Sequence, residues 1–309
     1  MGVRAVAAVP PVIPLAAVLV VWCLATSGAS AQQQFQLYAS ILDASGAPPA
    51  ALRPADVRVQ ENGAEAKVVK VESVSIPVKL QLLVDNGVGL GGDNIAHLKN
   101  GVRGLLEALP PGIEVTFVTT GGQPKFLVRA TTNKEALMKG LGLLGPEGGA
   151  GRFVEALLDA TERIEKDKSV YAPVIVAFAT TAGDVNVKEQ DGERLAKRMQ
   201  TRPTTVHTVL LSLLGTRSAL GGANQTEVGV GLSKMTGGRF EAIAAPSRLA
   251  TLLPEIGAQV AKAHERQIHQ FKITAQRPAG ASGELGNVGM GASAAFTIAS
   301  VSFDGRITN

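Results

Sequence analysis

The sequence predicts an α/β protein with a doubly wound, mostly parallel sheet and a small N-terminal antiparallel β module. From Pro77 onward, strand-like and helix-like patterns alternate, which is typical of parallel sheets covered by helices. Apolar runs such as 174–178 are expected for strands that are buried on both faces. Between Phe35 and Ser75, short runs alternate apolar and polar residues, which favours antiparallel strands with one exposed face.

The N-terminal module is predicted to contain three strands, at 35–42, 57–60 and 67–74. Turn-forming residues separate these runs. The strongest turn signal is the pair Asn62-Gly63, because Asn-Gly suits the tight turn of a hairpin.

The α/β region is predicted to contain six strands and six helices. The spacing of Leu98, Val102 and Leu105 gives one apolar face to the first helix. Gly237 and Gly238 are expected to end the fifth helix with a left-handed cap before the last strand. The predicted strands are 78–84, 113–119, 125–129, 173–180, 205–212 and 239–243, and the predicted helices lie near 94–108, 133–143, 152–167, 187–200, 225–236 and 246–265.

The end of the chain contains a glycine-rich stretch followed by a strand-like run. Residues 279–291 are interpreted as a linker with little to pack. The run 295–303 alternates cleanly, so with 269–275 it either adds strands to the β module or forms a frayed terminus. The predicted division is a signal peptide at 1–31, the β module at 32–76, the α/β domain at 77–277, and the linker and C-terminal β tail at 278–309.

The first 31 residues have the pattern of a secretory signal. Arg4 precedes an apolar run from Val12 to Leu24, and Ala29-Ser-Ala31 follows, which predicts cleavage after Ala31. An uncleaved membrane anchor is the alternative, although the run is shorter than the roughly 20 residues that a bilayer needs. We therefore expect a secreted or periplasmic protein with no membrane span after cleavage, and a mature chain without cysteine, since the single Cys23 lies in this segment.

The charge pattern argues against a nucleic-acid partner. The chain has 30 Lys and Arg against 26 Asp and Glu. Without 1–31, which contributes Arg4, the balance is 29 against 26, or +3. No block of five like charges occurs and tyrosines are scarce, whereas nucleic-acid-binding domains concentrate basic charge. The four histidines show no zinc-binding spacing.

The segment that follows the first strand of the α/β region resembles a metal loop. Asp85-Asn-Gly87-Val-Gly89 is similar to the Asp-x-Ser-x-Ser loop of von Willebrand factor type A domains, and 235–240 resembles the helix ending that leads into the last strand of those domains. The segments 43–48 and 52–63 resemble the region that precedes such domains in a family of bacterial secreted proteins. The resemblance implies a Rossmann-like fold and a metal-ion-dependent adhesion site.

The ligands that this resemblance implies are mostly missing, so we expect a degenerate adhesion site. Asp85 is present, but Gly87, Gly89 and Gly151 stand where hydroxyl ligands belong, and Thr181 stands where the second acid belongs. Glycine offers no side-chain oxygen to Mg²⁺ or Ca²⁺. We therefore expect no cofactor, with weak Mg²⁺ or Ca²⁺ binding left open. Asp184, three residues beyond Thr181, is the remaining candidate ligand.

The expected function is a non-enzymatic protein-interaction module for adhesion or scaffolding, with a protein partner in the envelope or extracellular space. The expected contact surface is the loops 85–93, 148–152 and 181–187, because ligands bind at the carboxyl ends of strands in such sheets. One alternative is a secreted hydrolase that uses Asp85 and Asp184 as an acid–base pair. Another is a structural envelope component. Without a cation, we expect backbone N–H groups of the glycine loop to hold Asp85.

Overall fold

The α/β part contains one mixed six-stranded sheet. A computed structural model describes residues 33–183, 187–213 and 219–308. Within this sheet the strand order is β6-β5-β4-β7-β8-β9. All neighbours are parallel except β6, which runs antiparallel to β5 at one edge. The strands are β4 (Val78–Val84), β5 (Glu114–Thr119), β6 (Lys125–Thr131), β7 (Ala172–Thr180), β8 (Thr205–Leu211) and β9 (Phe240–Ile243).

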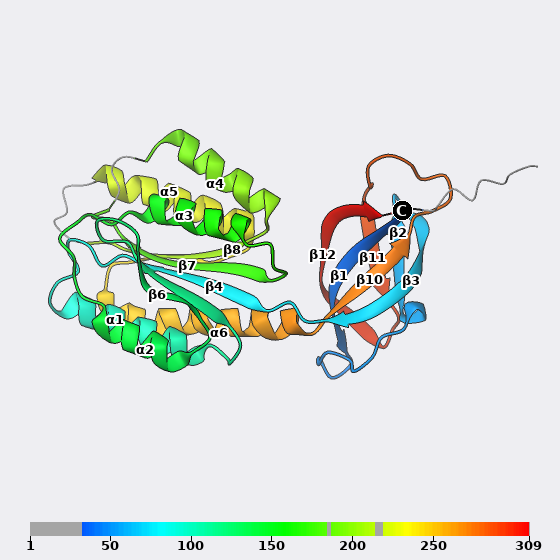
Figure 1. The fold of residues 1–309 in the computed structure, drawn as a ribbon, viewed down its shortest axis with the longest axis horizontal. Helices are drawn as coiled ribbons and strands as arrows, with labels where there is room; N and C mark the ends of the chain where they lie inside the picture. Colours follow the sequence, from blue (N-terminus) through cyan, green and yellow to red (C-terminus); the bar gives the residue numbers. More distant parts are fainter. Residues whose placement is uncertain (1–32, 184–186, 214–218, 309) are drawn as a thin grey trace, which may run out of the picture.

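Helices cover both faces of this sheet, as the alternating pattern predicts (Figure 1). One face packs against α1, α2 and α6, and the other against α3, α4 and α5. The fifth helix begins at 219 rather than at the predicted 225, because Gly221 and Gly222 weaken the helical signal at its start. The helices are α1 (Asp93–Ala108), α2 (Lys134–Leu143), α3 (Phe153–Lys166), α4 (Glu189–Thr201), α5 (Ala219–Thr236) and α6 (Leu249–Ile268).

A second sheet is built from both ends of the chain. Its order is β11-β2-β3-β10-β1-β12, and all its pairs are antiparallel. Its apolar core includes Phe35, Leu37, Val59 and Ile273. The strands are β1 (Gln34–Asp43), β2 (Val57–Glu61), β3 (Ala64–Val74), β10 (Gln270–Gln276), β11 (Val288–Ala292) and β12 (Phe296–Thr308), and a 3₁₀ turn, η1 (Pro54–Asp56), precedes β2.

The C-terminal residues form strands of this second sheet rather than a frayed end. β12 pairs with β1, and β10 lies between β1 and β3. β10 therefore joins the N-terminal strands, although its residues fall inside the predicted range 77–277. The interpretation of 279–291 as a linker with little to pack is wrong for its last residues. Val288 and its neighbours pair with β2 as β11, and Leu285 packs against the core, because β2 has an open edge that an alternating run can fill.

No helix in the described part of the chain is long and apolar enough to span a bilayer. This finding concerns the described residues and leaves the predicted signal segment, 1–31, outside its scope. Cleavage after Ala31 therefore stays a prediction.

Candidate functional site

Asp85 lies at the carboxyl edge of the parallel sheet, directly after the central strand β4. Its backbone N–H donates to the carbonyl of Phe178 on β7 at 2.9 Å, which continues the ladder between the two strands by one residue. The side chain is buried, with 1% of its surface exposed. A glycine-rich turn then leads to α1. Sheet pairing therefore places a single carboxylate where α/β folds commonly bind ligands.

Three hydrogen-bond donors of the protein hold the carboxylate of Asp85. The backbone N–H of Gly87 donates to Oδ1 at 2.8 Å, as the sequence predicted for the glycine loop. Thr180 donates twice to Oδ2, from its backbone N–H at 3.1 Å and from its hydroxyl at 2.7 Å. Burial nevertheless raises the pKa of the Asp85 carboxyl above its usual value, because the loss of hydration outweighs these three bonds.

The loop that precedes α3 lies against the loop of Asp85. The side chain of Asn86 accepts from the N–H of Gly121 at 3.0 Å and donates to the carbonyl of Gly145 at 2.8 Å. The backbone carbonyl of Asn86 accepts from Glu147 at 2.7 Å. The N–H of Val88 donates to the carbonyl of Gly149 at 3.0 Å. Asn86 thus joins its own loop to Gly121 and to the segment 145–147 beside the carboxylate.

Glycines allow these backbones to approach one another closely. A Cβ on Gly151 would overlap the carboxylate of Asp85, and a Cβ on Gly87 would overlap the carbonyl oxygen of Gly149. A Cβ on Gly149 would overlap the backbone of Gly122. The backbone of 149–151 therefore fills the space beside the carboxylate, and a side chain at position 87 or 151 has no room in this arrangement.

The remaining predicted site residues contact other partners or fall outside the described residues. Gly89 has a φ of +93° and packs against Leu213, where a Cβ would overlap the leucine side chain. The hydroxyl of Thr181 accepts from the N–H of Leu213 at 3.0 Å. Asp184 falls outside the described residues, so its distance from Asp85 is untested. The structure thus brings together Asp85, Gly87 and Gly151.

Thr180 and Asn86 contribute to the site but are not among the site residues that the sequence predicts. The sequence offers a modest signal for each residue. Thr180 is a hydroxyl residue at the end of the predicted strand 173–180, and Asn86 is an amide residue next to the acid that follows the predicted strand 78–84. The resemblance aligns Thr181, rather than Thr180, with a metal ligand. The pleat of β7 directs the preceding residue toward Asp85 instead.

Among the described residues, the donor set around Asp85 offers few ligands for a divalent cation. Both carboxylate oxygens already accept hydrogen bonds, one of them from the hydroxyl of Thr180. Positions 87 and 151 beside the carboxylate are glycines and carry no hydroxyl side chain. Mg²⁺ and Ca²⁺ need six or more oxygen ligands in an open coordination sphere. Within the described ranges, no group of three or more His, Cys, Asp or Glu side chains is gathered as a metal site would require.

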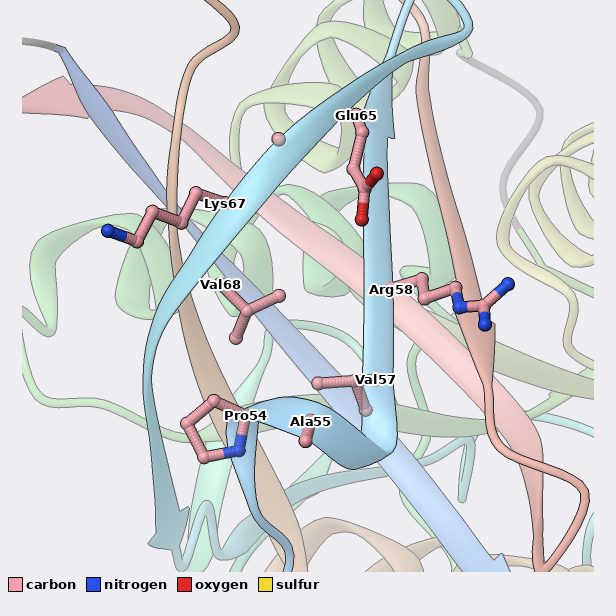
Figure 2. A pocket seen from close by; sticks show the side chains of 8 residues that line it. Pro54, Ala55, Val57, Arg58, Glu65, Lys67 and Val68 are labelled. Carbon is pink, nitrogen blue, oxygen red and sulfur yellow. The ribbon is translucent and has the colours of Figure 1, made fainter.

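A second candidate is a surface pocket of about 570 Å³ in the β module. It opens where β3 diverges from β2 after their short pairing. Figure 2 shows Val57 and Val68 beside this opening, with Pro54 and Ala55 of η1 at its end. The side chains of Arg58 and Lys67 point away from it. The lining combines apolar side chains with the charged residues Arg58, Glu65 and Lys67, and it holds one carboxylate rather than a pair. Asp85 therefore remains the better candidate site.

Comparisons with known proteins agree with this architecture. No protein-family model matches the chain, and no curated protein matches its sequence. Among solved structures, a von Willebrand factor type A protein from Catenulispora acidiphila is similar with a TM-score of 0.50 and 12% identity, over 89% of this chain and 74% of that one.

Two further solved structures are similar at lower TM-scores. The SpRpn10 VWA domain is 18% identical over 59% of this chain and 98% of its own, with a TM-score of 0.46. The vWF domain of the type V pilus tip protein Mfa5 from Porphyromonas gingivalis is 12% identical over 62% of this chain and 97% of its own, also with a TM-score of 0.46. At such identities a likeness concerns the fold alone. The strand order, the two helical layers and the Catenulispora match together give the α/β domain the von Willebrand factor type A fold.

Proposed function

We propose that this protein is a secreted or periplasmic, non-enzymatic protein-interaction module whose type A domain acts without a bound metal ion. The observation that carries the proposal is the packing of the 149–151 backbone against the carboxylate of Asp85. Protein groups donate hydrogen bonds to both carboxylate oxygens of Asp85. Asp85 therefore orders the loops at the carboxyl edge of the parallel sheet. These loops then act as a preformed surface.

The partner surface comprises the loops 85–93 and 148–152, together with the described part of 181–187. Val88 is an apolar side chain at the tip of the first loop and is 42% exposed. Its backbone is bonded to Gly149, so the tip is anchored rather than loose. An exposed apolar side chain on an ordered loop suits a protein partner, because rigid loops lose little entropy on binding.

The hydrolase alternative is less favoured by the environment of Asp85. A general acid or base must reach the substrate within hydrogen-bond distance, yet this carboxylate is buried and engaged by three protein donors. Asp85→Asn discriminates between the two functions. The hydrolase requires complete loss of an activity with unchanged stability, whereas the interaction module requires partner binding to persist.

Metal independence is tested by the melting temperature of the purified protein. A ligand that binds only the native state raises the melting temperature. We expect the same value in millimolar Mg²⁺, in millimolar Ca²⁺ and in EDTA. A rise of several degrees with either cation that Asp85→Ala abolishes would contradict the proposal.

The contact surface is tested by capture from envelope extracts. Val88→Asp places a charge at the proposed surface, and Val170→Asp is the matched control, because Val170 is also exposed but precedes β7 at the opposite edge of the sheet. We expect Val88→Asp to lose the captured partner and Val170→Asp to retain it. Equal capture by both variants would show that these loops are not the contact surface.

The secretion step is tested by N-terminal sequencing of the exported protein, with Gln32 as the expected first residue.

A further inference from the structure

The sheet of the β module has an opening between two of its inner strands. β2 and β3 pair only from Val59 with Ala66 to Glu61 with Ala64. Beyond these pairs the strands diverge, and the pocket of about 570 Å³ lies between them (Figure 2). The short turn η1 lies at the far end of this opening. The opening is therefore bounded by a strand on each side, by the short ladder at one end and by η1 at the other.

Neither strand has a partner strand along this opening. On one side β3 pairs with β10 from Lys67 to Val74, and in the described part of the chain no strand pairs with its other side there. Across the opening, Val57 and Arg58 pair with β11 and not with β3. An unpaired strand edge presents N–H and C=O groups that can bind a further extended segment.

The register of the short ladder explains why the opening does not close. One further step would place Arg58 opposite Lys67, and the next would place Val57 opposite Val68. Like charges directly opposite each other destabilise a strand pair. Figure 2 shows the two cationic side chains pointing away from the opening, in opposite directions. In the described part of the chain, neither of them takes part in an ion pair.

The two faces of the opening differ in their chemistry. Val57 is buried and Val68 is half-buried against the core of the module, whereas Arg58 and Lys67 are exposed. Because successive side chains of a strand point to opposite faces, a segment in the opening directs one side chain toward the two valines and the next between the two cations. Glu65 adds one carboxylate to the lining, so two positive charges stand against one negative charge.

We propose that this opening is a second contact surface, which binds an extended segment of a partner protein in which an acidic residue adjoins an apolar one. The acidic side chain lies between Arg58 and Lys67 and accepts charge-assisted hydrogen bonds from both. The apolar side chain fills the space beside Val57 and Val68, and the backbone pairs with the free edge of β3. This surface belongs to the β module and does not depend on the loops around Asp85.

The test measures fluorescence anisotropy of a labelled peptide with the purified protein. The probe is fluorescein-labelled Ser-Thr-Val-Glu-Val-Thr-Ser, which presents an apolar residue beside the glutamate in either chain direction. One control peptide has glutamine in place of the glutamate, and the other has serine in place of both valines. We expect the probe to bind and each control peptide to bind at least roughly fivefold more weakly. Absence of binding by the probe, or equal binding of either control peptide, would overturn the proposal.

Charge reversal at exposed positions locates the site. Arg58→Glu together with Lys67→Glu should weaken binding of the probe by roughly tenfold or more, because like charges then face each other. This double variant should instead bind a peptide with lysine in place of the glutamate. Lys139→Glu together with Lys262→Glu is the matched control, because both lysines are exposed on helices of the α/β domain and the net charge changes equally. Equal loss in the two double variants would attribute the binding to net charge alone and contradict the proposal.

Two further measurements examine the backbone pairing and the competing occupant, a second copy of this chain. Hydrogen exchange of the β3 amides from Lys67 to Val71 should slow when the probe is bound, and unchanged exchange would exclude pairing with β3. Sedimentation velocity without peptide should give the same monomer for the parent and for Arg58→Glu with Lys67→Glu. A parent dimer that this double variant dissociates would assign the opening to a second copy and overturn the proposal.

Discussion

Thr180 holds Asp85 with two hydrogen bonds to the same carboxylate oxygen, one from its backbone N–H at 3.1 Å and one from its hydroxyl at 2.7 Å. The two residues are 95 positions apart in the sequence. Thr180 ends β7, and Asp85 directly follows the neighbouring strand β4. The hydroxyl bond is charge-assisted and buried, which makes it stronger than a typical neutral hydrogen bond.

Removal of this hydroxyl should destabilise the protein measurably. We expect Thr180→Val to lower the free energy of unfolding by about 1.5–3 kcal/mol, because it removes a hydrogen bond to a buried charged group. In an Asp85→Leu background the same change should cost much less. Urea unfolding of the four proteins gives the coupling free energy, and a value near zero would show that the two side chains do not interact.

Position 151 should not tolerate even one added methyl group. Gly151→Ala places a Cβ on the carboxylate of Asp85, so we expect a loss of about 1–3 kcal/mol, as is typical for overpacked interiors. Gly148→Ala is the matched control in the same loop, because its Cβ would meet no atom within 4 Å. Thermal or urea unfolding compares the two variants, and equal stabilities would mean that the loop stands away from Asp85.

Acid should destabilise the fold through His207. Burial, with a contribution from Arg239, lowers the pKa of His207 from 6.5 to about 4. Between these values the unfolded chain binds a proton that the folded chain does not. Stability is therefore greatest above pH 6.5 and falls as the pH decreases toward 4.

The decrease in the free energy of unfolding that His207 causes should reach about 3 kcal/mol near pH 4. Urea unfolding at several pH values measures it. His207→Asn keeps an acceptor for the N–H of Arg239, which now donates to Nδ1 at 3.2 Å, and should flatten the profile over this range. A variant with the same pH dependence as the parent would assign the acid sensitivity to other groups.

The buried ion pair of Glu61 and Arg277 should anchor the C-terminal strands. Arg277 donates to both carboxylate oxygens of Glu61, at 3.0 and 2.5 Å, and to the carbonyl of Gly283 at 2.8 Å. Arg277→Met leaves a buried carboxylate without its cation, so we expect a loss of about 3 kcal/mol by urea unfolding.

Two further variants determine whether this loss arises from the pair itself. The double change Glu61→Met with Arg277→Met should recover most of the stability, because it leaves no unpaired charge. Lys166→Met removes an exposed ion pair with Glu162 and should leave the stability unchanged. A double variant as unstable as the single one would indicate that packing, rather than charge, is responsible.

Local sequence patterns by themselves determined most of the elements of this protein, although β11 was not among them. The alternation of apolar strands and amphipathic helices predicted the α/β sheet, and β4 was predicted at 78–84 and observed at Val78–Val84. The same reasoning placed Asp85 at the end of a central strand beside a glycine loop. These inferences succeed because periodicity and turn chemistry act over a few neighbouring residues.

Only the tertiary structure decided what surrounds Asp85 and where the chain ends pair. Thr180 reaches the carboxylate because β7 lies beside β4, and the 149–151 backbone fills the adjacent space because facing glycines permit the approach. β10, β11 and β12 likewise joined the N-terminal sheet through long-range pairing. Such contacts depend on which distant surfaces bury one another, and a short run of sequence shows that a strand can form but not which strand will pair with it.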